Sequence, residues 1–328
     1  MKILVTGGAG YIGSHAVEIL KNSGHEVTVL DDCSTGHADS LPPTVRFVQG
    51  SLLDSELVSR ALKGCEAVMH FAGKSLVGES VEKPDLYRQV NVAGTKVLLT
   101  EMNTLGIKKI VFSSSAATYG EPQSSPVSET SQCAPTNPYG ETKLAIERDL
   151  STAALTQHVA AISLRYFNVA GALQTDRGWL SERHDPETHL IPNALRASAD
   201  APLRVFGRDW NTPDGTCIRD YVHVVDLIDA HIKALNSLVA SEHHVINIGS
   251  GSGYSVAQVI DAVSVVKNSP RATLDAPRRA GDPAVLVAIF LKRNNFCSGN
   301  LHDLYIKWLK IPLRLVNWFD FNYLNATD

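Results

Sequence analysis

Short apolar runs alternate with longer stretches of helical periodicity along the first half of the chain. The runs are rich in Val, Ile and Leu, and we expect strands at Lys2–Thr6, Glu26–Leu30, Val45–Val48, Glu66–His70, Lys109–Ser113 and Val159–Leu164. A helix is predicted over Tyr11–Ser23. Short strands that are apolar on both faces and separated by helices are typical of a parallel sheet covered on both sides. The pattern therefore predicts an α/β protein with a doubly wound, Rossmann-like parallel sheet.

The pattern is less regular beyond residue 165, where loops such as Asp209–Gly215 and Ser250–Gly253 contain Pro and Gly. A chain of 328 residues is long enough for two domains. We expect residues 1–165, with a return segment near residues 217–235, to form a nucleotide-binding domain. Residues 166–328 are expected to form a smaller C-terminal substrate-binding domain.

The last segment, residues 286–328, differs in composition from the rest of the chain. It holds eight aromatic residues in 43, whereas the preceding 285 residues hold fourteen. Its helical periodicity is weak. We expect this tail to be atypical and poorly integrated into the fold, with a diverged but well-packed C-terminal element as the alternative.

Charge and cysteine usage exclude several classes of function. The net charge is −4 and no basic stripe is present, which disfavours a nucleic-acid or membrane partner. No run approaches the roughly 20 apolar residues of a membrane span, and the first apolar run is interrupted at Gly7, too early for a signal peptide. We therefore expect a cytoplasmic protein. The five cysteines form no CxxC pair, and we expect no metal site.

A glycine-rich segment, GGAGYIG at Gly7–Gly13, follows the first predicted strand and opens the first predicted helix. Glycine permits the tight turn and the close approach of the backbone to a pyrophosphate, which the helix N-terminus then binds. Asp31 ends the second strand, 24 residues after Gly7. A carboxylate there binds the adenosine ribose hydroxyls and repels the 2′-phosphate of NADP. The segment therefore predicts binding of NAD.

A second group of polar residues points to proton transfer. Tyr139 and Lys143 are spaced i, i+4 in PYGETK and would share one face of a helix, with Pro138 in its first turn. A nearby ammonium lowers the pKa of a tyrosine, which would make Tyr139 a general base near neutral pH. Ser115, in SSSAATYG after the fifth strand, could bridge Tyr139 and a substrate hydroxyl. A Tyr/Lys pair alone is common on a solvated helix face. Together with the glycine-rich segment and Ser115, the pair is a more specific indication of a proton-transfer site.

In this order, GGAGYIG, SSSAATYG, PYGETK and RYFN resemble the extended short-chain dehydrogenase/reductase family. The segments FAGKSLVGES, NVAGT, ETHLIP, GTCIRDYVHV and APRRAGDP narrow the resemblance to its UDP-glucose 4-epimerases, over about Met1 to Ala288. The resemblance implies three catalytic residues, namely Ser115, Tyr139 and Lys143. It implies cofactor contacts at Gly7, Gly10, Tyr11, Ile12, Gly13, Asp31, Asp32, Cys33, Ser34, Ser51, Leu52, Phe71, Ala72, Gly73, Lys74, Asn91, Ser113, Tyr139, Lys143, Tyr166 and Phe167. It implies UDP-sugar contacts at Ser115, Tyr139, Asn168, His189, Leu190, Arg204, Val205, Phe206, Arg219, Arg279 and Asp282.

The residue types at two of these implied contacts, the diphosphate and the adenine, affect the expected strength of binding. Arg219 and Arg279 come from distant segments and would bind the diphosphate from two sides, a task for which arginine is better suited than lysine. Ser51 stands where many family members have Asp, so we expect a weaker contact with the adenine.

The resemblance further implies a homodimer that interconverts UDP-glucose and UDP-galactose by oxidation and re-reduction at the sugar C4, with NAD kept bound. A dehydratase is disfavoured because Ala116 and Ala117 stand where dehydratases carry an Asp-Glu pair. Two alternatives remain. One is another NAD-dependent nucleotide-sugar epimerase or decarboxylase, acting for example on a UDP-N-acetylhexosamine or a UDP-uronate. The other is a catalytically silent NAD-binding protein.

Overall fold

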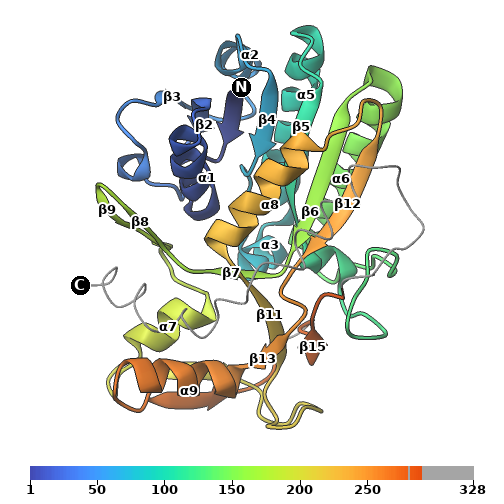
Figure 1. The fold of residues 1–328 in the computed structure, drawn as a ribbon. Helices are drawn as coiled ribbons and strands as arrows, with labels where there is room; N and C mark the ends of the chain where they lie inside the picture. The colour runs from blue at the N-terminus through green and yellow to red at the C-terminus, as the bar shows by residue number, and fades with distance from the viewer. Residues whose placement is uncertain (280, 290–328) are drawn as a thin grey trace.

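The computed structural model describes residues 1–279 and 281–289, which form a larger and a smaller lobe (Figure 1). A seven-stranded parallel sheet of order β12-β6-β5-β4-β1-β2-β3 forms the centre of the larger lobe. Its strands are β1 (Lys2–Thr6), β2 (Glu26–Asp31), β3 (Arg46–Gln49), β4 (Ala67–His70), β5 (Lys109–Ser115), β6 (Ala160–Tyr166) and β12 (His243–Ile248). The order reverses between β1 and β4, which is where such sheets bind a nucleotide. The predicted doubly wound sheet is thus confirmed.

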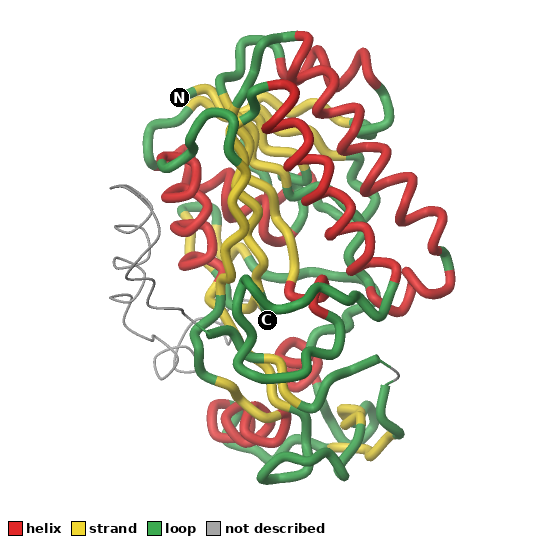
Figure 2. The backbone as a smooth tube through the Cα atoms, turned by 90° about the vertical axis from the view of Figure 1, so that its right-hand side faces the viewer, coloured by secondary structure: helices red, strands yellow, loops and turns green. Residues whose placement is uncertain are grey.

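Helices cover both faces of this sheet, as Figure 2 shows with the strands lying between them. One face is covered by α1 (Tyr11–Asn22) and α8 (Val224–Asn236). The other is covered by α2 (Ser55–Leu62), α5 (Gly94–Thr104) and α6 (Pro138–Gln157). Shorter elements connect them: η1 (Ala38–Ser40), α3 (Val77–Glu82), α4 (Pro84–Tyr87), the π-helical η2 (Arg88–Ala93) and the 3₁₀ turn η3 (Ala116–Tyr119). Both cores are aliphatic, so the burial of apolar side chains holds the helices against the sheet.

The smaller lobe consists of short strands and two helices. β11 (Ile218–His223) pairs with β7 (Asn168–Ala170), β13 (Gly253–Ser255) and β15 (Val285–Leu286). β10 (Leu203–Phe206) pairs with β14 (Thr273–Ala276), and β8 (Leu173–Thr175) forms a hairpin with β9 (Gly178–Leu180). α7 (Leu190–Arg196) and α9 (Val256–Val266) pack against this lobe's own apolar core.

The chain crosses between the lobes more than once. It leaves the large sheet after β6 and enters β7, and it returns through β11 into α8. Residues 217–235, where a return segment was expected, contain β11 of the smaller lobe and α8 of the larger lobe, and the chain then adds β12 at the edge of the large sheet beside β6. No helix of the described part of the chain is long and apolar enough to cross a membrane.

Only the beginning of the tail expected to be atypical falls within the described residues. Val287 and Ala288 are buried there, and the backbone of Ile289 donates a hydrogen bond to Val127 at 2.9 Å. Ala288 also pairs with Val127 in an isolated parallel bridge. The remainder of that prediction, residues 290–328, lies outside the described residues.

Candidate active site

The glycine-rich segment lies where β1 passes into α1, and two of its positions require glycine. Gly7 has a φ of +71°, and a Cβ there would lie 2.5 Å from the backbone nitrogen of Ala72. A Cβ on Gly13 would lie 2.0 Å from the carbonyl oxygen of Gly7. The first turn of α1 therefore packs tightly against the end of β1, which leaves backbone N–H groups at the helix N-terminus for an anion.

The carboxylate of Asp31 is held beside this segment at the end of β2. Its Oδ2 accepts a hydrogen bond from the backbone of Ala9 at 2.9 Å, and its Oδ1 accepts one from the backbone of Cys33 at 2.8 Å. Burial raises the pKa of Asp31, while these hydrogen bonds oppose the shift. Next to it, the exposed Asp32 accepts from the backbone of Ser34 at 2.9 Å. The second strand thus places one buried and one exposed acid at the expected ribose position.

A buried asparagine connects the loop after β4 to α6. Asn91 accepts a hydrogen bond from the backbone nitrogen of Lys74 at 2.8 Å and donates to its carbonyl at 3.0 Å. The same amide donates to Thr142 at 3.0 Å. A Cβ on Gly73 would lie 3.0 Å from the Asn91 oxygen. This network fixes the expected cofactor loop relative to the helix that carries Tyr139; Thr142 had no part in the sequence-based prediction.

The helix predicted for PYGETK is α6. Asn137 caps its N-terminus by accepting a hydrogen bond from the backbone of Gly140 at 2.9 Å, and Pro138 occupies the first turn. Gly140 is needed for close packing, since a Cβ there would lie 2.5 Å from the carbonyl oxygen of Ala117 in η3. The start of α6 therefore lies against the segment that follows β5, and Ser115 of that segment is near enough to Tyr139 to act on its pKa.

Tyr139 and Lys143 are both buried on one face of α6. The Lys143 Nζ donates to the carbonyl of Ser113 at 2.7 Å and lies 5.7 Å from the centroid of the Tyr139 ring. The expectation that Lys143 lowers the pKa of Tyr139 is wrong: burial raises that pKa, and the hydrogen bond from Ser115 opposes the rise only in part. Burial also lowers the pKa of Lys143 to about 8, against the attraction of Glu147. The ammonium is therefore engaged by a carbonyl and itself destabilised, which weakens its effect on the phenol.

A buried ion pair between Glu147 and Arg165 joins α6 to β6. Glu147 accepts hydrogen bonds from Arg165 at 2.9 Å and 2.5 Å and from Ser114 at 2.5 Å. The guanidinium also lies 4.8 Å from the centroid of the Tyr119 ring. Sequence reasoning missed this pair. The available signal was an arginine inside an apolar strand and a glutamate four residues after Lys143 on the same helix face.

Four of the expected UDP-sugar contacts form two pairs in the smaller lobe. Arg219 lies 3.7 Å from Asp282 and donates to the carbonyl of Pro283 at 2.8 Å. The guanidinium of Arg279 lies over the ring of Phe206, 3.9 Å from its centroid. The structure therefore brings the distant segments of β10, β11 and the loop after β14 together.

The same loop reaches the start of α6. Thr136, one residue before the cap of α6, donates to the carbonyl of Gly281 at 3.5 Å. The loop carrying Arg279 and Asp282 thus lies close to the helix carrying Tyr139. Thr136 was not among the expected site residues.

The other expected residues are distributed over several elements. Of the expected cofactor contacts, Tyr11 and Ile12 begin α1, and Phe71 and Ala72 follow β4. Ser113 is in β5, Tyr166 ends β6 and Phe167 follows it. Of the expected UDP-sugar contacts, Asn168 begins β7, His189 precedes Leu190 at the start of α7, and Val205 is buried in β10. The Tyr11 hydroxyl donates to the carbonyl of Gly171 at 2.7 Å. Leu52 differs from the rest because it is buried in the core beneath α2 and α5, and Arg204 is exposed.

Comparison with known proteins identifies the family. The model of a family described as "NAD dependent epimerase/dehydratase family" matches residues 3–249. The chain is similar to a UDP-glucose 4-epimerase of Corynebacterium glutamicum, with 48% identity over 88% of this chain and 87% of the relative.

Two solved structures show the same likeness. A UDP-glucose 4-epimerase from Brucella ovis in complex with NAD superposes with a TM-score of 0.83 at 40% identity, covering 88% of this chain and 89% of that one. One from Bifidobacterium longum in complex with NAD⁺ and UDP has a TM-score of 0.82 at 34% identity, covering 94% and 97%. The chain belongs to the NAD-dependent epimerase/dehydratase family, among its UDP-glucose 4-epimerases.

Proposed function

We propose that this protein interconverts UDP-glucose and UDP-galactose by reversible oxidation at the sugar C4, with NAD held throughout the cycle. The observation that carries the proposal is the buried Tyr139, near Ser115 and Lys143, on the helix that begins beside the carboxyl end of β5. The likeness to UDP-glucose 4-epimerases over most of the chain supports it.

The residues around the β1–α1 turn fit a dinucleotide. The turn from Gly7 to Gly13 is packed too tightly to admit a Cβ at either of these two glycines, and Asp31 presents a fixed carboxylate at the end of the neighbouring strand. NAD⁺, when bound, supplies the hydride acceptor and a positively charged ring. Asp31 would hold the ribose hydroxyls and disfavour the 2′-phosphate of NADP. Asn91 would keep the loop after β4 in place for this purpose.

Proton transfer falls to Tyr139 and its neighbours. The phenolate form would accept the proton of the sugar 4-hydroxyl, directly or through Ser115, and return it in the second half of the cycle. Because burial raises the pKa of Tyr139, the phenolate needs positive charge nearby. The bound cofactor would supply most of this charge, because the Lys143 ammonium is already engaged by the carbonyl of Ser113. The burial of Tyr139 also keeps water away from the exchanged proton.

Substrate binding falls to the smaller lobe. Arg219 and Arg279 would hold the diphosphate through charge-assisted hydrogen bonds. Binding energy taken from the UDP end leaves the hexose free to turn, so that hydride can return to its other face. The expected homodimer and cytoplasmic location stay predictions.

The deciding experiment is turnover of UDP-galactose by the purified protein, followed as UDP-glucose formation. Epimerisation without added reductant supports the proposal. A folded protein that retains NAD but shows no turnover of any UDP-hexose would instead favour the catalytically silent alternative.

We expect about one molecule of NAD to copurify with each chain. The cycle has no net redox change, so release of the cofactor serves no step. Denaturing the protein and assaying the supernatant enzymatically for NAD and NADP measures this. Asp31→Ala should lower the retained NAD, since the ribose loses its acceptor. Recovery of NADP in place of NAD would contradict the assignment of Asp31.

A second expectation concerns the width of the sugar site. Leu286 in β15 packs against a small cluster that includes Phe167 and Ala116, and the resemblance to UDP-glucose 4-epimerases implies that it stands where some of them have tyrosine. The smaller side chain should leave room for an N-acetyl group, so we expect turnover of UDP-N-acetylgalactosamine. Leu286→Tyr should lower kcat/KM for that substrate about tenfold or more while changing UDP-galactose little. Equal losses on both substrates would show that Leu286 does not set the width.

A further inference from the structure

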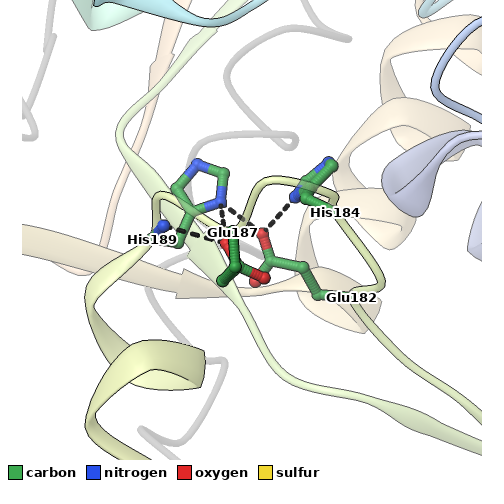
Figure 3. Close-up of side chains that lie close together, drawn as sticks. All are labelled: Glu182, His184, Glu187 and His189. Atoms are coloured by element: carbon green, nitrogen blue, oxygen red, sulfur yellow. Dashed lines mark hydrogen bonds and ion pairs between the residues drawn. The ribbon is translucent and has the colours of Figure 1, made fainter. Parts of the chain in front are cut away.

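Four histidine and glutamate side chains converge between β9 and α7, in the segment that joins the β8–β9 hairpin to α7 (Figure 3). They are Glu182, His184, Glu187 and His189, and one ligand-type atom of each lies within 4.8 Å of the others. The spacing is E-x-H-x-x-E-x-H along the chain. Sequence reasoning missed this group because it considered only the cysteines as metal ligands and assigned His189 to the substrate.

The two carboxylates are buried and each has one oxygen without a partner. The Glu182 and Glu187 side chains are 1% and 4% exposed. The Oε1 of Glu182 accepts from the Nδ1 of His184 at 2.8 Å and pairs with the Nδ1 of His189. The Oε1 of Glu187 accepts from the backbone nitrogens of Thr188 and His189 at 2.8 Å and 2.9 Å. The Oε2 atom of each is buried and has no hydrogen bond, which is costly for a carboxylate oxygen.

The charge of the group calls for a cation. Within the described part of the chain, the ion-pair partners of Glu182 and Glu187 are histidines alone, with no lysine or arginine among them. Two buried carboxylates side by side require compensating positive charge, which a divalent cation or protonated histidines can supply, and titration with metal distinguishes the two.

We propose that Glu182, His184, Glu187 and His189 bind one Zn²⁺ ion. Zn²⁺ takes imidazole nitrogen and carboxylate oxygen at about 2.0–2.2 Å, which places neighbouring ligand atoms of a tetrahedron about 3.3 Å apart. In the structure the Glu182–His189 contact is the shortest, Glu182 and His184 are 2.8 Å apart, and the outer limit is 4.8 Å, so side-chain rotations would have to bring these spacings to the tetrahedral value. Four protein ligands close the coordination shell, which is the arrangement of a structural zinc site.

The position of the four side chains between the β8–β9 hairpin and α7 indicates a structural role for the ion. Arg177, in the turn of the β8–β9 hairpin, pairs with Glu18 of α1 at 3.1 Å, and the ring of Tyr11 lies 6.2 Å from that of His184. The zinc would therefore fasten the start of α7, with Leu190, to the hairpin that contacts α1. His189 would bind through Nδ1 and keep Nε2 free for another partner. The inference is independent of the proposed function, because metal binding is measured without turnover.

The test uses the full chain, stripped with a chelator and titrated with Zn²⁺ and, separately, with Co²⁺ as a spectroscopic probe. We expect one equivalent of Zn²⁺ to bind with a rise in Tm, and Co²⁺ to give the intense visible absorption of a tetrahedral site. Glu187→Gln and His184→Ala should each weaken Zn²⁺ binding at least a hundredfold. His244→Ala is the matched control, since His244 pairs with Glu242 at 2.6 Å elsewhere on the surface and should leave binding unchanged.

Two results would overturn the proposal. The first is no stoichiometric uptake of Zn²⁺ by the unmodified protein, which would mean that the four side chains hold one another through shared protons. The second is uptake that survives unchanged in both variants. The Co²⁺ spectrum of the unmodified protein decides the matter even where a variant folds poorly, because weak octahedral absorption would exclude the proposed ligand set.

Discussion

Replacing Tyr139 with phenylalanine is expected to lower kcat for UDP-galactose about 10²–10⁴-fold. The substitution removes the phenolic oxygen that would exchange the proton of the 4-hydroxyl and leaves the buried ring in place. Ser115 stays at the site, but its hydroxyl is a far weaker base than a phenolate. The proton then has no acceptor, while the diphosphate contacts in the smaller lobe are unchanged.

The loss should therefore appear in kcat and not in binding. Retained NAD and the affinity for UDP, measured by calorimetry on the same preparation, should stay close to those of the unmodified protein. Tyr254→Phe, in β13 of the smaller lobe, removes a tyrosine hydroxyl elsewhere and should keep full activity. Turnover by Tyr139→Phe at the normal rate would show that another group moves the proton.

The elements that could be predicted from the sequence are those whose signal is local. β-branched runs marked six strands of the large sheet, and glycine spacing marked the β1–α1 turn because backbone contact there excludes a Cβ. β12 was not predicted, because it joins the edge of the sheet only after the chain has passed through the smaller lobe. Its pairing with β6 depends on tertiary structure and leaves no periodic trace.

The candidate site, like the fold, could be predicted only where the signal in the sequence is local. The i, i+4 spacing of Tyr139 and Lys143 was enough to place them on one helix face. Their electrostatics could not be read from spacing, because burial raises the pKa of one and lowers that of the other. The contact of Glu147 with Arg165 joins a helix to a strand, and the Glu182 cluster depends on the fold of one loop. Each is decided by packing and not by residue type.

The Glu147–Arg165 pair should contribute strongly to stability as well. Both side chains are almost fully buried, at 4% and 6% exposed. Arg165→Met keeps much of the aliphatic volume but leaves the Glu147 carboxylate buried without its counter-charge. Breaking a buried pair in this way costs about 3–5 kcal/mol. Urea unfolding at a fixed concentration of NAD measures the change in the free energy of unfolding.

A matched surface pair provides the control. Arg88 lies 3.2 Å from Asp85, with side chains 59% and 95% exposed, so Arg88→Met should cost less than about 1 kcal/mol. The double variant Glu147→Gln, Arg165→Met removes both buried charges and should recover part of the loss, because the unpaired carboxylate causes most of the penalty. If Arg165→Met cost no more than Arg88→Met, Glu147 would have to find another counter-charge, for which Lys143 on the same helix is the candidate. If the double variant were no more stable than Arg165→Met, lost packing against Tyr119 would account for the effect instead.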